Sequence, residues 1–317
     1  MKVLVTSGWL NQDFIDRWQA DFPNVEFVGG SNEEELMAVA GDVEVAFGSV
    51  TENIVKSAPN LKWVQSGSAG VEWMRHAPSL IDSDIQVTNT RGAHATTIAE
   101  HTFGMLVFLA RRFDETYEAQ KRHEWIRGSS TPRTGLVGLT MGIIGLGQIG
   151  RAIAKRAHAF EMNVIAVDVN KVPKPDYVSE VRQLDGLPDL MRRSDVVVVA
   201  IPITAETRGM IHGELLRMMK PSAYLLVMSR GGIIDEPTLV DMLHNNQLAG
   251  AGLDVAATEP LPADNPLWDC PRIIITPHNS PSSDQTRANV MSIMKENLQR
   301  YLAGEQLNNL VDKEAGY

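Results

Sequence analysis

The chain has little of several features that mark specialised classes of protein. One of its 317 residues, Cys270, is a cysteine, so no disulfide can form within the chain. Basic residues are outnumbered by acidic ones, 29 to 39, which gives a formal charge of −10. Because a basic surface is needed to meet phosphates, we expect neither nucleic acid nor an anionic membrane as the main partner. A single thiol fits a reducing compartment, and we predict a cytoplasmic protein.

The chain also lacks a long apolar run and a cluster of metal ligands. Its most apolar helix candidate has eight uncharged residues, Phe103 to Ala110, between polar flanks, too few to span a bilayer. The opening stretch MKVLVTSGWLNQD reaches polar residues too soon for a signal peptide. The eight histidines are scattered, without cysteine or carboxylate partners at metal-site spacing. We therefore predict no transmembrane segment and no catalytic metal.

What the sequence does contain is an alternation of short apolar runs with helical patterns. The early runs are KVLVTS, VEVAFGS, LKWVQSGS and IQVTNTRG. A helical segment over about 94–125 follows, and then come MGIIGL, NVIAVDV, SDVVVVAI, SAYLLVMS, LAGAGLDV and RIIITPH. Such alternation predicts an α/β protein with parallel sheets. We expect two blocks, with four or five strands in the early one and six in the later one.

A glycine-rich turn opens the later block, with about 140 residues before it. Gly145, Gly147 and Gly150 form G-x-G-x-x-G between an apolar run and a helical pattern. In this setting the motif predicts a dinucleotide site, where the helix N-terminus meets the pyrophosphate. Asp168 follows Gly150 by eighteen positions at the end of the next apolar run, where its carboxylate can bind the ribose hydroxyls. Asp168 favours NAD over NADP, although Lys171 lies three residues further on.

Several later runs end in side chains that can do chemistry. Arg230 follows YLLVMS, Asp254 ends AGAGLD and His278 ends IIITPH, while Glu259 lies just beyond Asp254. Ligands of open parallel sheets bind beyond the carboxyl ends of the strands. Each residue alone has an ordinary structural explanation. Together they supply a cation for a carboxylate, an acid–base group and a carboxylate to tune it, which predicts an active site at this edge.

These motifs together resemble the D-2-hydroxyacid dehydrogenase family of NAD-dependent oxidoreductases, nearly from end to end. The matching stretches are 89–111, 142–160, 201–211, 229–239, 252–268 and 276–280. The resemblance implies a Rossmann-type cofactor domain, residues 94–284, inserted into a flavodoxin-like substrate domain, residues 1–93 plus 285–317. A whole domain would then precede the glycine turn, which explains its late position. A homodimer with the segment near 94–125 at its interface is also implied.

The resemblance implies roles for individual residues. It makes Arg230 the binder of the substrate carboxylate, His278 the acid–base and Glu259 its carboxylate partner. The residues that it assigns to the cofactor are Gly145, Gly147, Gln148, Ile149, Gly150, Asp168, Pro202, Thr207, Ser229, Arg230, Asp254 and His278. Those that it assigns to the substrate are Ser68, Ala69, Gly70, Arg230 and His278, with the loop SGSAG offering backbone N–H groups to an anion.

The leading hypothesis is an enzyme that interconverts a 2-keto acid and a D-2-hydroxy acid with NAD(H). The alternative is an NAD-binding regulator, because some relatives of this family are transcriptional corepressors. The sequence departs from the family at Val227, where asparagine is usual, and in the rigid run NSPSS after His278. Glu259 argues against formate as substrate, because formate-specific members carry glutamine there. The absence of lysine from SGSAG argues against phosphite.

Overall fold

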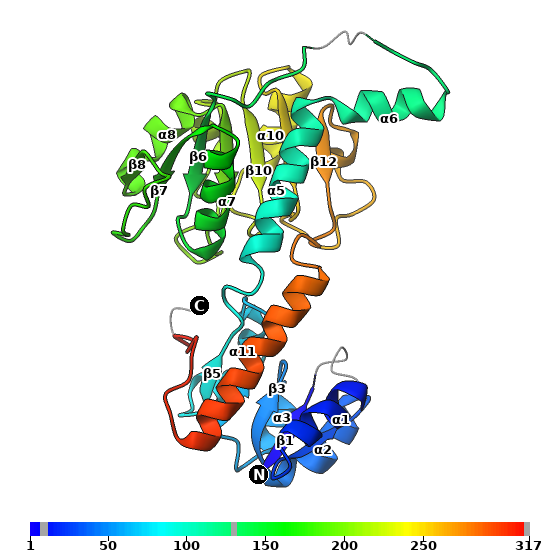
Figure 1. Cartoon of the computed structure of the whole chain (residues 1–317), viewed down its shortest axis with the longest axis vertical. Coiled ribbons are helices and arrows are strands. Elements are labelled where there is room, and N and C mark those ends of the chain that lie inside the picture. Colours follow the sequence, from blue (N-terminus) through cyan, green and yellow to red (C-terminus); the bar gives the residue numbers. More distant parts are fainter. Residues whose placement is uncertain (7–11, 128–131, 314–317) are drawn as a thin grey trace. The chain divides into compact units, whose positions relative to one another are not determined.

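The structure of the chain is a computed structural model that describes residues 1–6, 12–127 and 132–313. The chain divides into two compact units (Figure 1). Unit 1 comprises Met1–Ala93 and Asp284–Tyr317, and unit 2 comprises His94–Ser283. Both are built from parallel strands and helices, which confirms the predicted α/β class. No helix formed by the described residues is long and apolar enough to cross a membrane.

Within its described residues, unit 1 has a five-stranded parallel sheet in the order β2-β1-β3-β4-β5. The strands are β1 (Lys2–Val5), β2 (Glu26–Gly29), β3 (Val43–Phe47), β4 (Trp63–Gln65) and β5 (Gln86–Thr88). The helices are α1 (Gln12–Asp21), α2 (Glu33–Val39), α3 (Glu52–Ser57), α4 (Pro78–Ile81) and α11 (Asp284–Ala303).

Both faces of this sheet are covered, because alternate strand residues point to opposite sides. Val3, Val5 and Phe47 face a cluster that contains Trp18 of α1 and Met294 of α11. On the other face, Leu4, Ala46 and Val64 pack with residues of α2, α3 and α4. The C-terminal helix α11 is thus part of the core of the first unit of the chain.

Unit 2 has, within its described residues, a seven-stranded parallel sheet in the order β12-β11-β10-β9-β6-β7-β8. The strands are β6 (Thr140–Ile144), β7 (Asn163–Val167), β8 (Glu180–Arg182), β9 (Val196–Val199), β10 (Tyr224–Val227), β11 (Gly250–Leu253) and β12 (Ile273–Ile275). The helices are α5 (Ala95–Ala110), α6 (Phe113–Lys121), α7 (Gln148–Ala159), α8 (Leu187–Arg193), α9 (Gly213–Leu216) and α10 (Glu236–His244).

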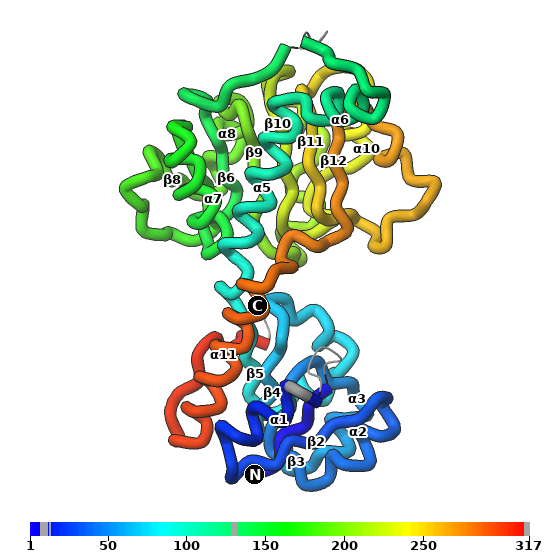
Figure 2. Tube along the Cα trace, turned by 45° about the vertical axis from the view of Figure 1, so that its right-hand side comes forward, coloured from blue at the N-terminus to red at the C-terminus, as the bar shows by residue number. Residues whose placement is uncertain are grey.

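The helices of unit 2 lie on both faces of its sheet (Figures 1 and 2). One core joins α5 and α7 to Ile143, Val198 and Leu226. The other core joins α8, α9 and α10 to the alternate strand residues, among them Ile144 and Val227. This double covering explains why the strands are nearly continuous apolar runs. It leaves the carboxyl ends of the strands, and the loops that follow them, as the place for polar chemistry.

The expected strand count of the later block was wrong by one. The sequence predicts six strands in the later block, counting the one that leads into the glycine turn, whereas the described residues form seven. The additional strand, β8, is three residues long, has the sequence EVR and lies at the edge of the sheet. A short edge strand carries no apolar run, so the pattern used for the other strands cannot detect it.

Candidate active site

The glycine-rich turn joins β6 to α7 with the backbone geometry that its sequence requires. Gly145 has φ +97°, and a Cβ on it would lie 2.8 Å from Ala200 O. A Cβ on Gly150 would lie 1.9 Å from Gly145 O, so the helix can approach the strand only through glycine. A Cβ on Gly147 would meet nothing within 4 Å, which leaves open space in front of the turn. The turn therefore fits a pyrophosphate group.

The N-terminus of α7 faces this space with unused donors. The helix begins at Gln148, and its first backbone bond runs from Arg151 N–H to Gly147 O. The N–H groups of Gln148, Ile149 and Gly150 therefore have no partner within the helix. Gln148 is exposed and Ile149 is half-buried. Such a helix end carries partial positive charge and suits phosphate oxygens.

Asp168 lies directly after β7 and is tied to the glycine turn. Its carboxylate is 9% exposed and accepts hydrogen bonds from Leu146 N–H at 2.8 Å and Asn170 N–H at 2.9 Å. One bond goes to each oxygen, so each keeps lone-pair capacity for a hydroxyl donor. The turn that would hold a pyrophosphate and the carboxylate that would hold a ribose are thus fixed to each other.

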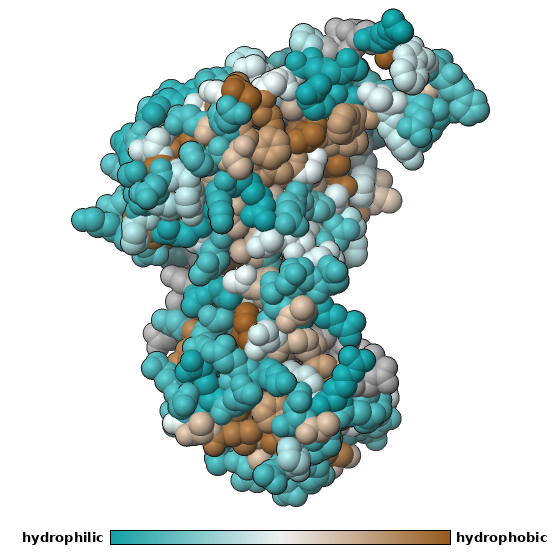
Figure 3. Space-filling view, in the orientation of Figure 1, coloured by the Kyte–Doolittle hydropathy of each residue, from teal (hydrophilic) through white to brown (hydrophobic). Residues whose placement is uncertain are grey.

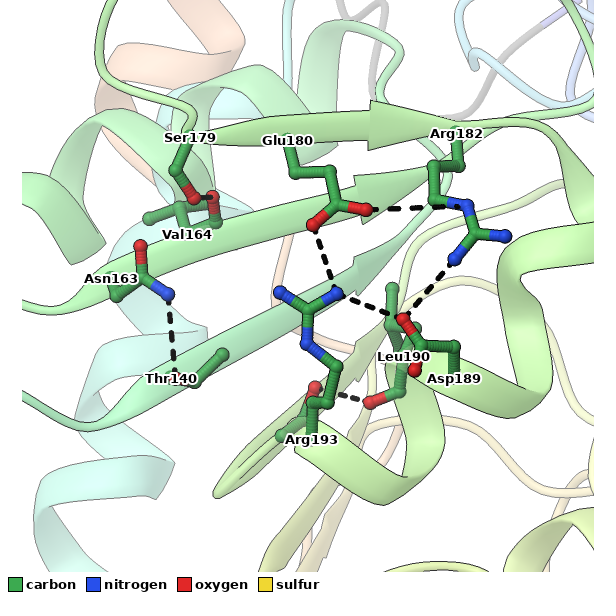
Figure 4. Close-up of polar contacts among 10 residues, drawn as sticks. Thr140, Asn163, Val164, Ser179, Glu180, Arg182, Asp189, Leu190 and Arg193 are labelled. Carbon is green, nitrogen blue, oxygen red and sulfur yellow. Dashed lines mark hydrogen bonds and ion pairs between the residues drawn. The ribbon is translucent and has the colours of Figure 1, made fainter.

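The guanidinium groups of Arg182 on β8 and Arg193 at the end of α8 are already paired with carboxylates. Asp168 N–H donates to Arg182 O on the neighbouring strand β8. The Arg182 guanidinium donates to Asp189 at 3.2 Å, and that of Arg193 reaches Glu180 at 2.9 Å and Asp189 at 2.8 Å (Figure 4). A 2′-phosphate next to Asp168 would need an available cation, and these two side chains are held by acidic partners.

The loops after β9 and β10 contain four more of the residues assigned to the cofactor. Pro202 O accepts a hydrogen bond of 2.7 Å from the Thr207 hydroxyl, whose oxygen also accepts from Thr204 N–H. Ser229 is buried, and its hydroxyl oxygen has no partner among the described residues. Ser229 O accepts a 2.8 Å bond from the Arg230 guanidinium. These loops stand at the carboxyl edge of the same sheet as the glycine turn.

His278 and Glu259 form a hydrogen-bonded pair. His278 Nδ1 lies 2.8 Å from Glu259 Oε2, and both side chains are a little over one-third exposed. An ionised carboxylate can only accept, so Nδ1 carries the hydrogen and Nε2 faces away from the pair. Glu259 Oε1 accepts from Ala256 N–H at 3.0 Å, which fixes the carboxylate in the turn after β11.

Asp254 anchors the turn that carries His278. Its carboxylate is buried and accepts from Ser280 N–H at 3.1 Å, Asn279 N–H at 3.1 Å and the Thr276 hydroxyl at 2.5 Å. Asp254 O also accepts from His278 N–H at 2.8 Å. His278 has φ +51°, a left-handed conformation that costs about 1–2 kcal/mol for a residue with a Cβ. The bonds to Asp254 offset that cost.

Arg230 lies at the same edge, next to a histidine that the sequence interpretation did not single out. His94 immediately precedes α5, 136 positions before Arg230. Burial lowers the pKa of His94, and the positive charge of Arg230 lowers it further. Its Nδ1 is buried and has no partner among the described residues. His94 falls within the stretch 89–111, but only the folded chain brings it to Arg230.

The loop Ser66–Gly70 of unit 1 has all its carbonyl groups occupied. Ser66 O accepts from the Gln65 amide at 2.9 Å, and Gly67 O and Ser68 O accept from Thr90 at 3.2 Å each. Ala69 O accepts from the Asn89 amide at 2.9 Å, and Gly70 O from the Ser68 hydroxyl at 2.7 Å.

Three amide groups of this loop, unlike its carbonyl groups, have no hydrogen-bond partner within the described residues. Among the described residues, the N–H groups of Gly67, Ala69 and Gly70 donate no hydrogen bond. Because the carbonyl oxygens are held by internal donors, the loop can present N–H groups to a ligand without presenting negative partial charge. Unpartnered backbone amides grouped in one short loop suit a carboxylate.

Comparison with known proteins assigns the chain and its fold to one family. Residues 103–280, more than half of the chain, match the family model "D-isomer specific 2-hydroxyacid dehydrogenase, NAD binding domain". D-3-phosphoglycerate dehydrogenase of Methanocaldococcus jannaschii is 33% identical over 98% of this chain. The chain spans 59% of that relative's length. Glyoxylate reductase of Thermofilum pendens is 32% identical over 89% of this chain and 85% of its own.

Solved structures give the same assignment. A D-isomer specific 2-hydroxyacid dehydrogenase family protein from Aeromonas salmonicida superposes with a TM-score of 0.84 at 31% identity, covering 98% of this chain and 99% of that one. A D-isomer specific 2-hydroxyacid dehydrogenase from Xanthobacter autotrophicus in complex with NADPH and MES gives 0.82 at 29% identity, covering 99% and 100%. The chain belongs to the D-isomer specific 2-hydroxyacid dehydrogenase family.

Proposed function

We propose that the protein reduces a 2-keto acid to a D-2-hydroxy acid with NADH and catalyses the reverse reaction with NAD. The observation that carries this proposal is the 2.8 Å pair of His278 Nδ1 and Glu259 Oε2, because it fixes an acid–base group with its free nitrogen available. Arg230 follows β10, two strands along the sheet from β12, which precedes His278. The relatives named glyoxylate reductase and D-3-phosphoglycerate dehydrogenase act on acids of this chemical class.

In this proposal the residues of the site divide the steps of the reaction among them. Arg230 binds the substrate carboxylate with two parallel hydrogen bonds. In the loop of Ser68, Ala69 and Gly70, the N–H groups of Ala69 and Gly70 bind a carboxylate, whereas Ser68 N–H already donates to Ser66 Oγ at 3.2 Å. His278 Nε2 delivers a proton to the ketone oxygen during reduction and removes it during oxidation. Glu259 stabilises the protonated ring and keeps the hydrogen on Nδ1. A bound nicotinamide supplies or accepts the hydride.

The cofactor would lie along the carboxyl edge of the sheet of unit 2. We assign it to Gly145, Gly147, Gln148, Ile149, Gly150, Asp168, Pro202, Thr207, Ser229, Arg230, Asp254 and His278. The open space at Gly147 and the unused N–H groups of α7 support a pyrophosphate there. Within this set, Asp254 acts by holding the turn that carries His278.

We propose NAD as the preferred cofactor, although some structural relatives bind NADPH. Asp168 would repel a 2′-phosphate, and Arg182 and Arg193 are paired with Glu180 and Asp189. The wild-type protein should therefore have a lower KM for NADH than for NADPH. Asp168→Ala should raise the KM for NADH about tenfold, through loss of charge-assisted hydrogen bonds, and lower that for NADPH. A wild-type preference for NADPH would refute this assignment.

We also propose a homodimer formed through unit 2. Trp125 is 90% exposed, and Ile126, Tyr117 and Phe113 are about half exposed around α6. Figure 3 shows hydrophobic side chains gathered on the part of unit 2 that carries α5 and the start of α6. Aromatic side chains of this kind are enriched at protein interfaces. Sedimentation should give a dimer that Trp125→Glu weakens, while Leu302→Glu, an equally polar change on α11, leaves it intact.

Cys270 supports a reducing, cytoplasmic location, which we propose as well. The side chain is buried, and burial raises the pKa of its thiol, with the charge of Asp269 adding to the effect. A thiol in this environment is a structural residue rather than a nucleophile.

One experiment tests the reaction directly. NADH oxidation is measured with glyoxylate, hydroxypyruvate, pyruvate and phenylpyruvate, and the configuration of the product is determined. Turnover with a D-product supports the enzyme. Tight NADH binding without turnover of any of these acids, or of others of the class, would favour a regulatory protein instead.

A further inference from the structure

A second carboxylate lies close to the Glu259–His278 pair. Glu236 is the first residue of α10, and its Oε1 accepts a 2.6 Å hydrogen bond from Ala257 N–H. The preceding amide, Ala256 N–H, donates to Glu259 Oε1 at 3.0 Å. Two consecutive N–H groups of one turn are thus divided between two carboxylates that come from different elements of unit 2.

This turn also packs against the loop that follows Arg230. A Cβ placed on Gly231 would lie 1.8 Å from Ala256 O and 2.5 Å from Ala257 N. No side chain fits at that position unless the turn moves. The backbone next to Arg230 and the backbone that holds Glu259 are therefore in direct contact, and a shift of the Ala256–Ala257 turn would disturb both.

Glu236 is partly withdrawn from water and lies within reach of the charge of Glu259. The side chain is half-buried, and burial raises the pKa of its carboxyl. The hydrogen bond from Ala257 N–H acts in the opposite direction, and the negative charge of Glu259 raises the pKa again. The charge of Glu259 thus acts on Glu236, and both carboxylates are hydrogen-bonded to the same turn.

We propose that Glu236 is a positioning residue for the Glu259–His278 pair and acts by holding the Ala256–Ala257 turn from α10. With Ala257 N–H bound to Glu236, Ala256 N–H points at Glu259 Oε1, and Glu259 Oε2 is left to His278 Nδ1. Glu236 touches neither the substrate nor the reacting atoms in this scheme. The proposal rests on the proposed 2-keto acid reduction, because it assigns a role within that same site.

Two substitutions at Glu236 separate its hydrogen bond from its charge. Glu236→Gln keeps an oxygen acceptor for Ala257 N–H and removes the charge. Glu236→Ala removes both. Glu214→Gln is the matched control, because Glu214 is an exposed acid in the first turn of α9, also in unit 2. For each protein, kcat and KM for the best keto acid, the affinity for NADH, Tm and the pH profile of reduction are measured.

The positioning role predicts a distinct pattern. Glu236→Ala should lower kcat about tenfold or more while NADH affinity stays within about twofold. Glu236→Gln should keep kcat within about threefold. The pH at which its reduction rate falls to half should be lower than in the wild type, because the Glu259–His278 pair has lost a neighbouring negative charge. Glu214→Gln should match the wild type.

Other patterns would overturn the proposal. One such pattern is a Glu236→Ala variant with wild-type kcat and a wild-type pH profile. Another is a variant of Glu236 in which Tm or NADH affinity falls while kcat and the pH profile stay unchanged. If Glu236→Ala does not fold, the pH profile of Glu236→Gln decides alone. A wild-type protein that reduces no keto acid would instead refute the proposed function, which is a separate result.

Discussion

The Nδ1–H of His278 donates to Glu259 Oε2 over 2.8 Å, although His278 itself has a left-handed backbone conformation. The bonds that hold this conformation come from Asp254, at the end of the neighbouring strand β11. The orientation of the imidazole ring is therefore set from two sides, at the backbone and at Nδ1. Its remaining nitrogen, Nε2, is the group for which we propose proton transfer.

Removal of the Glu259 charge should shift the pH dependence of catalysis in one direction. Glu259→Gln keeps a hydrogen-bonding side chain beside His278 but no longer stabilises the protonated ring. Reduction, which needs the protonated ring, should therefore decline at a lower pH than in the wild type. Oxidation, which needs the neutral ring, should persist to lower pH.

Initial rates in both directions across pH 5 to 9 check this pair of shifts. His278→Ala is the companion variant and should lose about a hundredfold or more of kcat in both directions with NADH binding intact. Shifts of the opposite sign in Glu259→Gln, or none, would mean that another group tunes the acid.

Arg230 should not be replaceable by lysine. A guanidinium holds a carboxylate with two parallel hydrogen bonds, whereas an ammonium is a point charge. Arg230→Lys should lower kcat/KM for the keto acid about tenfold to a hundredfold, with the dissociation constant of NADH nearly unchanged. Arg217→Lys, a change on the surface pair with Asp241, is the control and should have no effect. An equal loss of NADH affinity in Arg230→Lys would indicate a structural role.

Substitution of Thr90 should weaken binding of the keto acid and leave binding of the cofactor unchanged. Its hydroxyl and its N–H donate to Gly67 O and Ser68 O, and Thr90→Val removes the first of these bonds. With a net value of about 1 kcal/mol for that bond, the KM for the keto acid should rise about fivefold. Thr51→Val, which removes the cap of α3, should lower Tm and leave KM unchanged. A Thr90→Val protein with wild-type KM would show that the loop does not bind substrate.

His94 should make the folded protein less stable in mild acid. Burial, and then the charge of Arg230, lower its pKa from the ordinary value of 6.5. The unfolded chain therefore binds this proton more readily than the folded one, so the free energy of unfolding should fall as pH drops below about 6.5.

Urea unfolding at pH 5.5 and 7.5 measures this effect. His94→Gln should show a smaller difference in unfolding free energy between the two pH values than the wild type. His212→Gln, at an exposed histidine before α9, is the control and should keep the wild-type difference. An unchanged difference in His94→Gln would refute the role of His94.

The α/β class, the parallel sheets and the family follow from apolar runs, turn residues and motifs along the chain. Those signals are local, and the pairing of polar residues at strand ends follows from them because parallel strands end at one edge. Contacts that depend on tertiary structure leave no such signal. Glu236 and Ala257 are 21 positions apart, and His94 and Arg230 are 136 apart. The three-residue strand β8 was missed because its sequence, EVR, contains no apolar run.

The most direct test of the account is NADH oxidation by the wild-type protein and by His278→Ala with the same panel of 2-keto acids. We predict that the wild type reduces at least one of them to the D-2-hydroxy acid. We also predict that His278→Ala binds NADH with similar affinity but turns over at a rate lower by about two orders of magnitude. Equal turnover by the two proteins, or none by the wild type with NADH bound, would contradict the account.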